Sequence, residues 1–127
     1  MKRFLLIPLL VVLAAVAAFA LAGRFSPRPA GPARTIEMRM YDYTFNGTNP
    51  TLAFEPGERV RFVVRNDEDS PVKHNFRIVG LDVPCERELL PGETREVTVT
   101  LPRSGEFAYT CCTHPGMGGK LVIQGKE

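Results

Sequence analysis

The sequence predicts an all-β domain, a Greek-key β-sandwich, preceded by an N-terminal export segment and a short spacer. Three observations support this prediction. After residue 35, apolar residues recur at every second position in several short runs, turn-forming residues separate these runs, and no stretch has a helical period. The 127 residues are enough for one small domain once the N-terminal segment is set aside.

Residues 1–22 have the pattern of a signal peptide or a membrane anchor. Lys2 and Arg3 precede an uncharged apolar run at residues 4–22, whose alanines near the end suit a signal peptidase. The run is also long enough to stay in a bilayer as a tether, so both fates remain open. In either case the positive residues stay inside, which places the domain in the periplasm or on the extracytoplasmic face of the membrane. Residues 23–34 are rich in proline and predict an extended spacer.

Residues 35–127 form the predicted domain, in which each strand alternates between core-facing and outward-facing residues. In the second strand, for example, Val60, Phe62 and Val64 face the core, while arginines occupy the alternate positions. Residues 41–45 continue the β-prone composition of the first strand until a turn begins at Asn46. The expected strands lie at residues 36–40, 60–64, 74–80, 97–101, 107–111 and 120–124.

The charge distribution argues against nucleic acid as a partner. The whole chain carries a net charge of +2, but five of its sixteen basic residues precede position 35, whereas all fourteen acidic residues follow it. The domain therefore carries eleven basic against fourteen acidic residues, a net charge of −3. Such a surface does not attract a phosphate backbone.

Four residues of the domain form a ligand set typical of copper. His74 and Cys111 share the inward parity of their strands, and His114 and Met117 follow Cys111 on one loop. A thiolate, two imidazoles and a weakly bound methionine sulfur make up the site of a blue-copper electron-transfer protein. Zinc is the competing metal, but tetrahedral zinc sites seldom use methionine.

The ligand loop resembles that of the cupredoxins, and most of all the amicyanin and plastocyanin branch. The resemblance covers residues 35–127 and is carried by His74-Asn75 and by the motif Gly105-x-Phe107-x-Tyr109-x-Cys111-x-x-His114-Pro115-x-Met117-x-Gly119-Lys120. It implies one type 1 copper ion per chain. It also implies that Asn75 ties the two ligand loops together and hydrogen-bonds the thiolate, and that electrons pass through the exposed edge of His114.

Cys85 and Cys112 depart from the amicyanin pattern. They form a disulfide, or one of them is an additional or replacement copper ligand, or both are unpaired thiols. A binuclear copper centre, as in oxidase subunit II, is a further alternative. It requires two bridging cysteines spaced C-x-x-x-C, whereas Cys111 and Cys112 are adjacent and point to opposite sides of a strand.

The leading functional prediction is an exported carrier of single electrons between respiratory or dehydrogenase partners, such as a dehydrogenase, a c-type cytochrome or an oxidase. No motif for a substrate pocket, a general base or a second copper cluster is present, so we expect no enzyme activity. The alternative functions are a copper carrier that delivers metal to an oxidase, and the binuclear domain described above.

Overall fold

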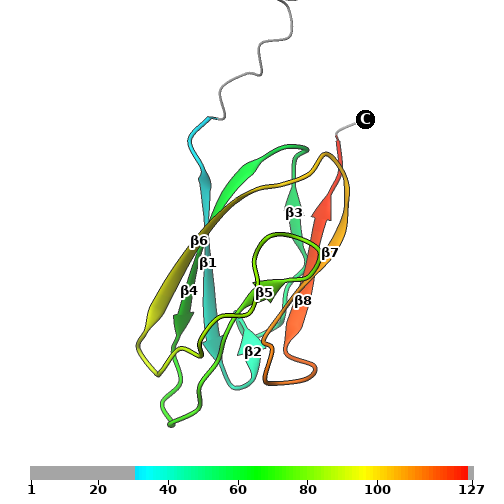
Figure 1. The fold of residues 1–127 in the computed structure, drawn as a ribbon. Helices are drawn as coiled ribbons and strands as arrows, with labels where there is room; N and C mark the ends of the chain where they lie inside the picture. The colour runs from blue at the N-terminus through cyan, green and yellow to red at the C-terminus, as the bar shows by residue number, and fades with distance from the viewer. Residues whose placement is uncertain (1–30, 126–127) are drawn as a thin grey trace, which may run out of the picture.

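The computed structural model describes residues 31–125, which fold into two four-stranded sheets packed face to face (Figure 1). This architecture confirms the predicted all-β sandwich. The described part of the chain contains no helix, and hence none that is long and apolar enough to cross a bilayer. The expected signal or anchor segment at residues 1–22 lies outside the described residues, as does most of the spacer. The strands are β1 Arg34–Tyr41, β2 Thr44–Phe45, β3 Leu52–Phe54, β4 Arg59–Asn66, β5 Arg77–Ile78, β6 Thr94–Thr100, β7 Gly105–Thr110 and β8 Gly118–Ile123.

The first sheet has the strand order β2-β1-β4-β6 and confirms the predicted parity of its strands. β1 and β4 run parallel, from the pair Arg34 and Val60 to the pair Met40 and Asn66, and β6 pairs antiparallel with β4. The inward-facing residues of β4 are buried, whereas its arginines lie on the outer face, where Arg61 forms an ion pair with Glu96 of β6. The outer face of this sheet is therefore an ordinary solvated surface.

The second sheet has the order β3-β8-β7-β5, and its antiparallel β7–β8 hairpin carries the ligand loop. Tyr109 of β7 is completely buried and donates a hydrogen bond of 2.5 Å from its hydroxyl to the carbonyl of Pro50. Gly119 of β8 lies against this hydroxyl, and a Cβ atom at Gly119 would come within 2.7 Å of the Pro50 oxygen. A glycine is thus required where the ring crosses the neighbouring strand.

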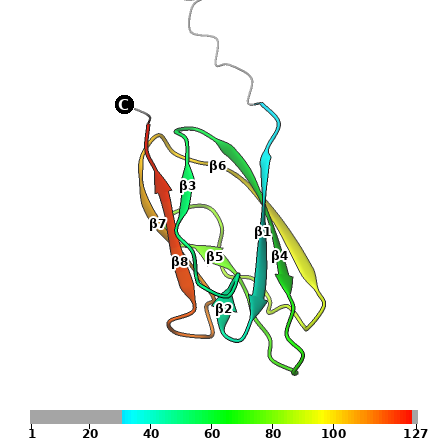
Figure 2. The same ribbon diagram turned by 180° about the vertical axis from the view of Figure 1, so that it is seen from behind.

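The core fills the space between the sheets and extends to the end of the sandwich that holds the ligand loop. Its aromatic members contact one another edge to face or tilted, as Phe45 does with Phe76 and Tyr109. The chain passes from one sheet to the other at each connection between β2 and β7, which joins the two layers. Figure 2 shows the turn between β1 and β2, the loop after β4 and the β7–β8 connection together at one end, opposite both termini of the described chain.

The structure differs from the predicted strands in three places. Tyr41 ends β1 and residues 42–45 do not continue it, because Asp42 and Tyr43 adopt positive φ values of 48° and 56°. These two residues form a hairpin turn that reverses the chain into β2. A short strand at 52–54 was not expected. The predicted strand at 74–80 is reduced to β5 and an isolated bridge between His74 and Leu89, since the residues around them form loops rather than ladders.

Candidate metal centre

His74 is fixed in the interior before β5 begins. Its backbone pairs in both directions with Leu89, with N···O distances of 3.3 Å from His74 and 2.6 Å from Leu89. The side chain has no exposed surface. The predicted inward parity of His74 is therefore realised by a bridge to a distant loop rather than by a regular strand.

Cys111, His114 and Met117 lie on the seven-residue connection that begins where β7 ends. Two backbone hydrogen bonds close this loop on itself, from the Cys111 amide to the Met117 carbonyl at 3.0 Å and from the Met117 amide to the His114 carbonyl at 3.2 Å. Cys111 and Met117 are buried, whereas His114 is partly exposed. The loop thus holds two sulfur side chains inside the fold and leaves one imidazole at the surface.

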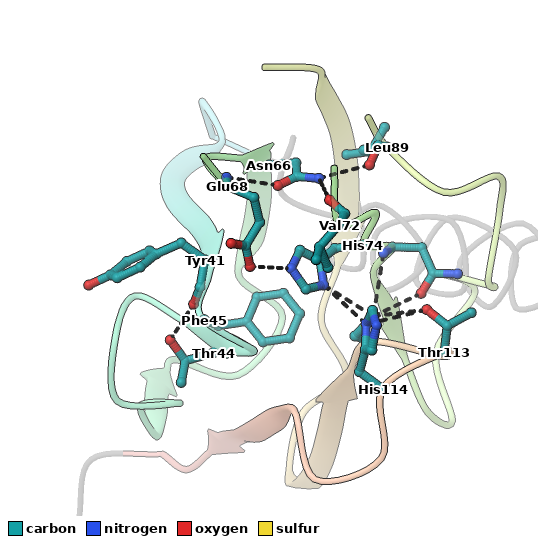
Figure 3. A network of polar contacts seen from close by, with 12 residues as sticks. Tyr41, Thr44, Phe45, Asn66, Glu68, Val72, His74, Leu89, Thr113 and His114 are labelled. Atoms are coloured by element: carbon teal, nitrogen blue, oxygen red, sulfur yellow. Dashed lines mark hydrogen bonds and ion pairs between the residues drawn. The ribbon is translucent and has the colours of Figure 1, made fainter. Parts of the chain in front are cut away.

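The side chains of His74, Cys111 and His114 converge on one point. The Nδ1 atoms of the two histidines are 3.1 Å apart, and the Cys111 sulfur lies 3.3 Å from Nδ1 of His114 and 3.9 Å from Nδ1 of His74. All three ligand atoms lie within 4.8 Å of one another, and Figure 3 shows the two imidazoles turned toward each other. Two imidazole nitrogens and one thiol sulfur in this arrangement suit a single thiophilic metal ion, with buried Met117 on the same loop.

Asn75 connects the two segments that carry these ligands. Its backbone amide is 3.5 Å from the Cys111 sulfur, and its side-chain Oδ1 accepts a hydrogen bond of 2.6 Å from the Cys112 amide. The residue is buried, with 5% of its surface exposed. Its contacts are those that the family resemblance implied, a bridge between the loops and a hydrogen bond to the thiol.

Cys85 and Cys112 are joined by a disulfide, with their Cα atoms 6.4 Å apart. Cys85 belongs to the long connection between β5 and β6, so the bond fastens that connection to the ligand loop directly beside Cys111. Cys111 is then the only free cysteine of the three in the chain. One thiol remains for a metal.

Two further residues border the cluster and were missed by the sequence analysis. Glu68 lies in the loop after β4, and its Oε1 atom is 2.8 Å from Nε2 of His74. The inward parity of Val64 and Asn66 continues to Glu68, and this signal could have identified it. Tyr43, on the β1–β2 turn, packs edge to face against His74 and His114 at centroid distances of 5.9 and 5.0 Å. Nothing in the alternation pattern indicated the reversal that places its ring there.

Ion pairs of Asp67 fix the start of the loop that carries Glu68. Asp67 accepts hydrogen bonds from Arg39 and from Arg65, the latter at 2.6 Å, and its amide donates to the Met40 carbonyl at 2.8 Å. The hydrogen bond from Arg39, together with that from Arg65, holds the pKa of the Asp67 carboxyl below its usual value. In the core between the sheets, burial raises the pKa of the Tyr109 hydroxyl to about 12.

Comparison with known proteins identifies the family. Residues 9–123 match the family model described as a cupredoxin-like domain, and the chain belongs to the cupredoxin family. It is similar to auracyanin B, with a TM-score of 0.61 and 24% identity over 74% of this chain and 91% of that one. It is also similar to reduced auracyanin from the photosynthetic bacterium Roseiflexus castenholzii, with a TM-score of 0.59 and 17% identity over 74% and 99% of the two chains.

A copper enzyme shares the fold as well. The copper nitrite reductase of Nitrosomonas europaea has a TM-score of 0.63 and 23% identity over 76% of this chain, but only 43% of its own length is covered. At these identities the structural likenesses show the fold alone. Family membership and the converging His–Cys–His cluster together support one copper ion as the cofactor of this chain and, in general terms, a role in copper electron transfer.

Proposed function

We propose that this chain is an exported mononuclear type 1, or blue, copper protein that carries single electrons between redox partners. Its copper is held by Nδ1 of His74, Sγ of Cys111 and Nδ1 of His114, with Met117 as the weak axial ligand. The convergence of these three atoms within 4.8 Å supports this assignment most directly. When bound, the metal supplies a one-electron couple that thiolate and imidazole ligands stabilise in both oxidation states.

The surrounding residues make the site rigid and leave one proposed ligand, His114, partly exposed for electron exchange. Asn75 spans the two ligand segments, and the backbone hydrogen bonds of the ligand loop fix the spacing between Cys111 and Met117. A site preformed in this way changes little between oxidation states, which favours fast electron exchange. His114 is the partly exposed ligand and is the proposed point at which a partner receives or delivers the electron.

The inventory of side chains favours a mononuclear carrier over the alternatives. A binuclear centre needs two bridging thiolates, but Cys112 is bonded to Cys85, and Cys111 is the one free thiol. A copper enzyme would need further histidines for a second site, whereas both histidines of this chain are in the cluster. We therefore infer a carrier without turnover of its own.

The proposed location is the periplasm or the extracytoplasmic face of the membrane. The apolar run at residues 4–22 supports export, and the disulfide supports an oxidising compartment. The partners proposed on these grounds are other extracytoplasmic redox proteins, namely a c-type cytochrome, an oxidase or a dehydrogenase. If residues 4–22 are retained, they would tether the carrier to the membrane.

The proposal is tested by adding one equivalent of Cu(II) to the domain and recording its visible and electron paramagnetic resonance spectra. We expect an intense copper–thiolate charge-transfer band and a narrow copper hyperfine splitting. Cys111→Ser should abolish both. A mixed-valence signal of two coupled copper ions would refute the mononuclear assignment, and the absence of any coloured species from the wild type would refute the blue-copper function.

A further inference from the structure

Glu68 makes the only carboxylate contact to the cluster among the described residues. The side chain is 10% exposed, and its Oε1 atom is 2.8 Å from Nε2 of the fully buried His74. Its neighbours along the loop face the other way, since Asp67 pairs with arginines of the outer face and Asp69 is exposed. Figure 3 shows Glu68 and His114 on opposite sides of the His74 ring.

The chemistry of this contact selects one tautomer of His74. An ionised carboxylate can only accept a hydrogen bond, so Nε2 must carry the hydrogen. The lone pair of the neutral ring is then on Nδ1, the nitrogen that lies 3.1 Å from Nδ1 of His114 and faces the Cys111 sulfur. In the other tautomer, Nδ1 would present a hydrogen to the cluster and Nε2 a lone pair to the carboxylate. The contact therefore prepares His74 as a ligand before any metal is bound.

The buried side chain of Asn66 holds the backbone of Glu68 in place. The Glu68 amide donates to Oδ1 of Asn66 at 3.0 Å, and Nδ2 of Asn66 donates to the carbonyls of Val72 and Leu89, both at 2.9 Å. Leu89 is in turn the backbone partner of His74. These hydrogen bonds, of which those of Asn66 are drawn in Figure 3, thus fix the backbone of both Glu68 and His74, whose side chains meet.

The two histidines differ in how many of their ring nitrogens make polar contacts. Within residues 31–125, the polar contacts of His114 are all made by Nδ1, whereas His74 is in contact at both ring nitrogens. We propose that Glu68 is a positioning residue that fixes the tautomer and orientation of His74, and that its charge strengthens the binding of oxidised copper. The effect of the Glu68 charge on copper binding rests on the proposed function, whereas the effect on the His74 tautomer does not.

The first test needs no metal. The tautomer of His74 in the apo-protein is measured from its imidazole nitrogen resonances by NMR. We expect the Nε2–H form in the wild type and in Glu68→Gln, whose side-chain oxygen can still accept. We expect loss of that preference in Glu68→Ala. The control is Asp69→Asn, which removes one charge from the same loop without contact to His74. An unchanged Nε2–H tautomer in Glu68→Ala would overturn the positioning role.

The second test measures copper. Loss of a partner of a ligating histidine typically weakens metal binding about 10–100-fold, and we expect this of Glu68→Ala with Cu(II) in a chelator competition. Glu68→Gln should have a more positive reduction potential, by about 59 mV for each tenfold loss of Cu(II) over Cu(I) affinity. An unchanged potential in Glu68→Gln, or an equal shift in Asp69→Asn, would overturn the role of the charge. A colourless wild type would refute the proposed function and leave the tautomer test intact.

Discussion

Removing the disulfide beside the ligand loop should destabilise the fold and leave the copper site in place. The change is the double variant Cys85→Ser, Cys112→Ser, which opens the bond between the β5–β6 connection and the loop that begins at Cys111. Cys111 itself is free and buried, and its hydrogen bonds to Asn75 do not depend on the bond. Stability and metal binding should therefore respond differently.

The size of the effect follows from the length of chain that the bond closes. The two cysteines are 27 residues apart. The chain-entropy relation then gives the unfolded state of the variant about 12 cal/mol/K more entropy, or about 3.5 kcal/mol at 25 °C. For a domain of this size the entropy of unfolding is about 0.2 kcal/mol/K, so the midpoint of thermal unfolding should fall by about 15–20 °C.

The assay is reversible urea or thermal unfolding of the wild type and the double variant, both without metal, followed by Cu(II) titration. A loss of stability below about 1 kcal/mol would show that this bond does not constrain the unfolded chain as calculated. Loss of the charge-transfer band in the double variant, with the fold retained, would contradict the independence of the Cys111 site from the disulfide. The matched single variant Cys111→Ser should have the opposite phenotype, with a stable fold and no band.

Three other substitutions test the supports around the site. Tyr109→Phe leaves the Pro50 carbonyl without its donor and should cost about 1–2 kcal/mol in urea unfolding; no loss would mean that water replaces the hydroxyl. Asp67→Asn should lower the melting temperature at neutral pH. Because the folded-state pKa of Asp67 is depressed, its contribution is present above the ordinary aspartate pKa and disappears as pH falls through the folded value, so the wild-type and variant melting curves should converge in acid. Parallel curves at all pH values would contradict this. Tyr43→Asn, which suits the positive φ of that residue but removes its ring from the two histidines, should speed copper loss to a chelator, whereas Tyr43→Phe should not.

The fold could be predicted because every second residue of a strand faces the core and is apolar. The alternation of Val60, Phe62 and Val64 with arginines is the same in the sequence as in β4. Local pattern was insufficient where backbone geometry overrides it. Asp42 and Tyr43 lie within a β-prone run, but their left-handed conformation turns the chain, and side-chain hydrogen bonds such as that from the Arg39 amide to Asn46 secure the reversal.

The proposed ligands could be named from spacing and Asn75 from the family resemblance, whereas Glu68 was missed and the disulfide was not decided. Cys111, His114 and Met117 are close in sequence, and the structure gathers the first two with His74 as the motif required. The disulfide remained one of several alternatives because its formation depends on the path of residues 81–91, which no periodicity describes. Glu68 lies in a polar loop, where a carboxylate is usually solvated. The inward parity of β4 extends to it, but only the fold shows its contact with His74.

The two histidines differ in their exposure and in what holds them in place. His74 is buried, paired through its backbone with Leu89 and in contact with Glu68, so its position is determined by the sandwich. His114 is partly exposed and sits on the short loop, with the ring of Tyr43 beside it. A protein that must exchange electrons but keep its metal needs one ligand at the surface and the others anchored. In this chain the buried histidine, His74, is the one that donates a hydrogen bond to a carboxylate, that of Glu68. Substitutions at Glu68 should therefore alter metal affinity. Substitutions at Tyr43, beside the exposed His114, should instead alter the rate of metal loss.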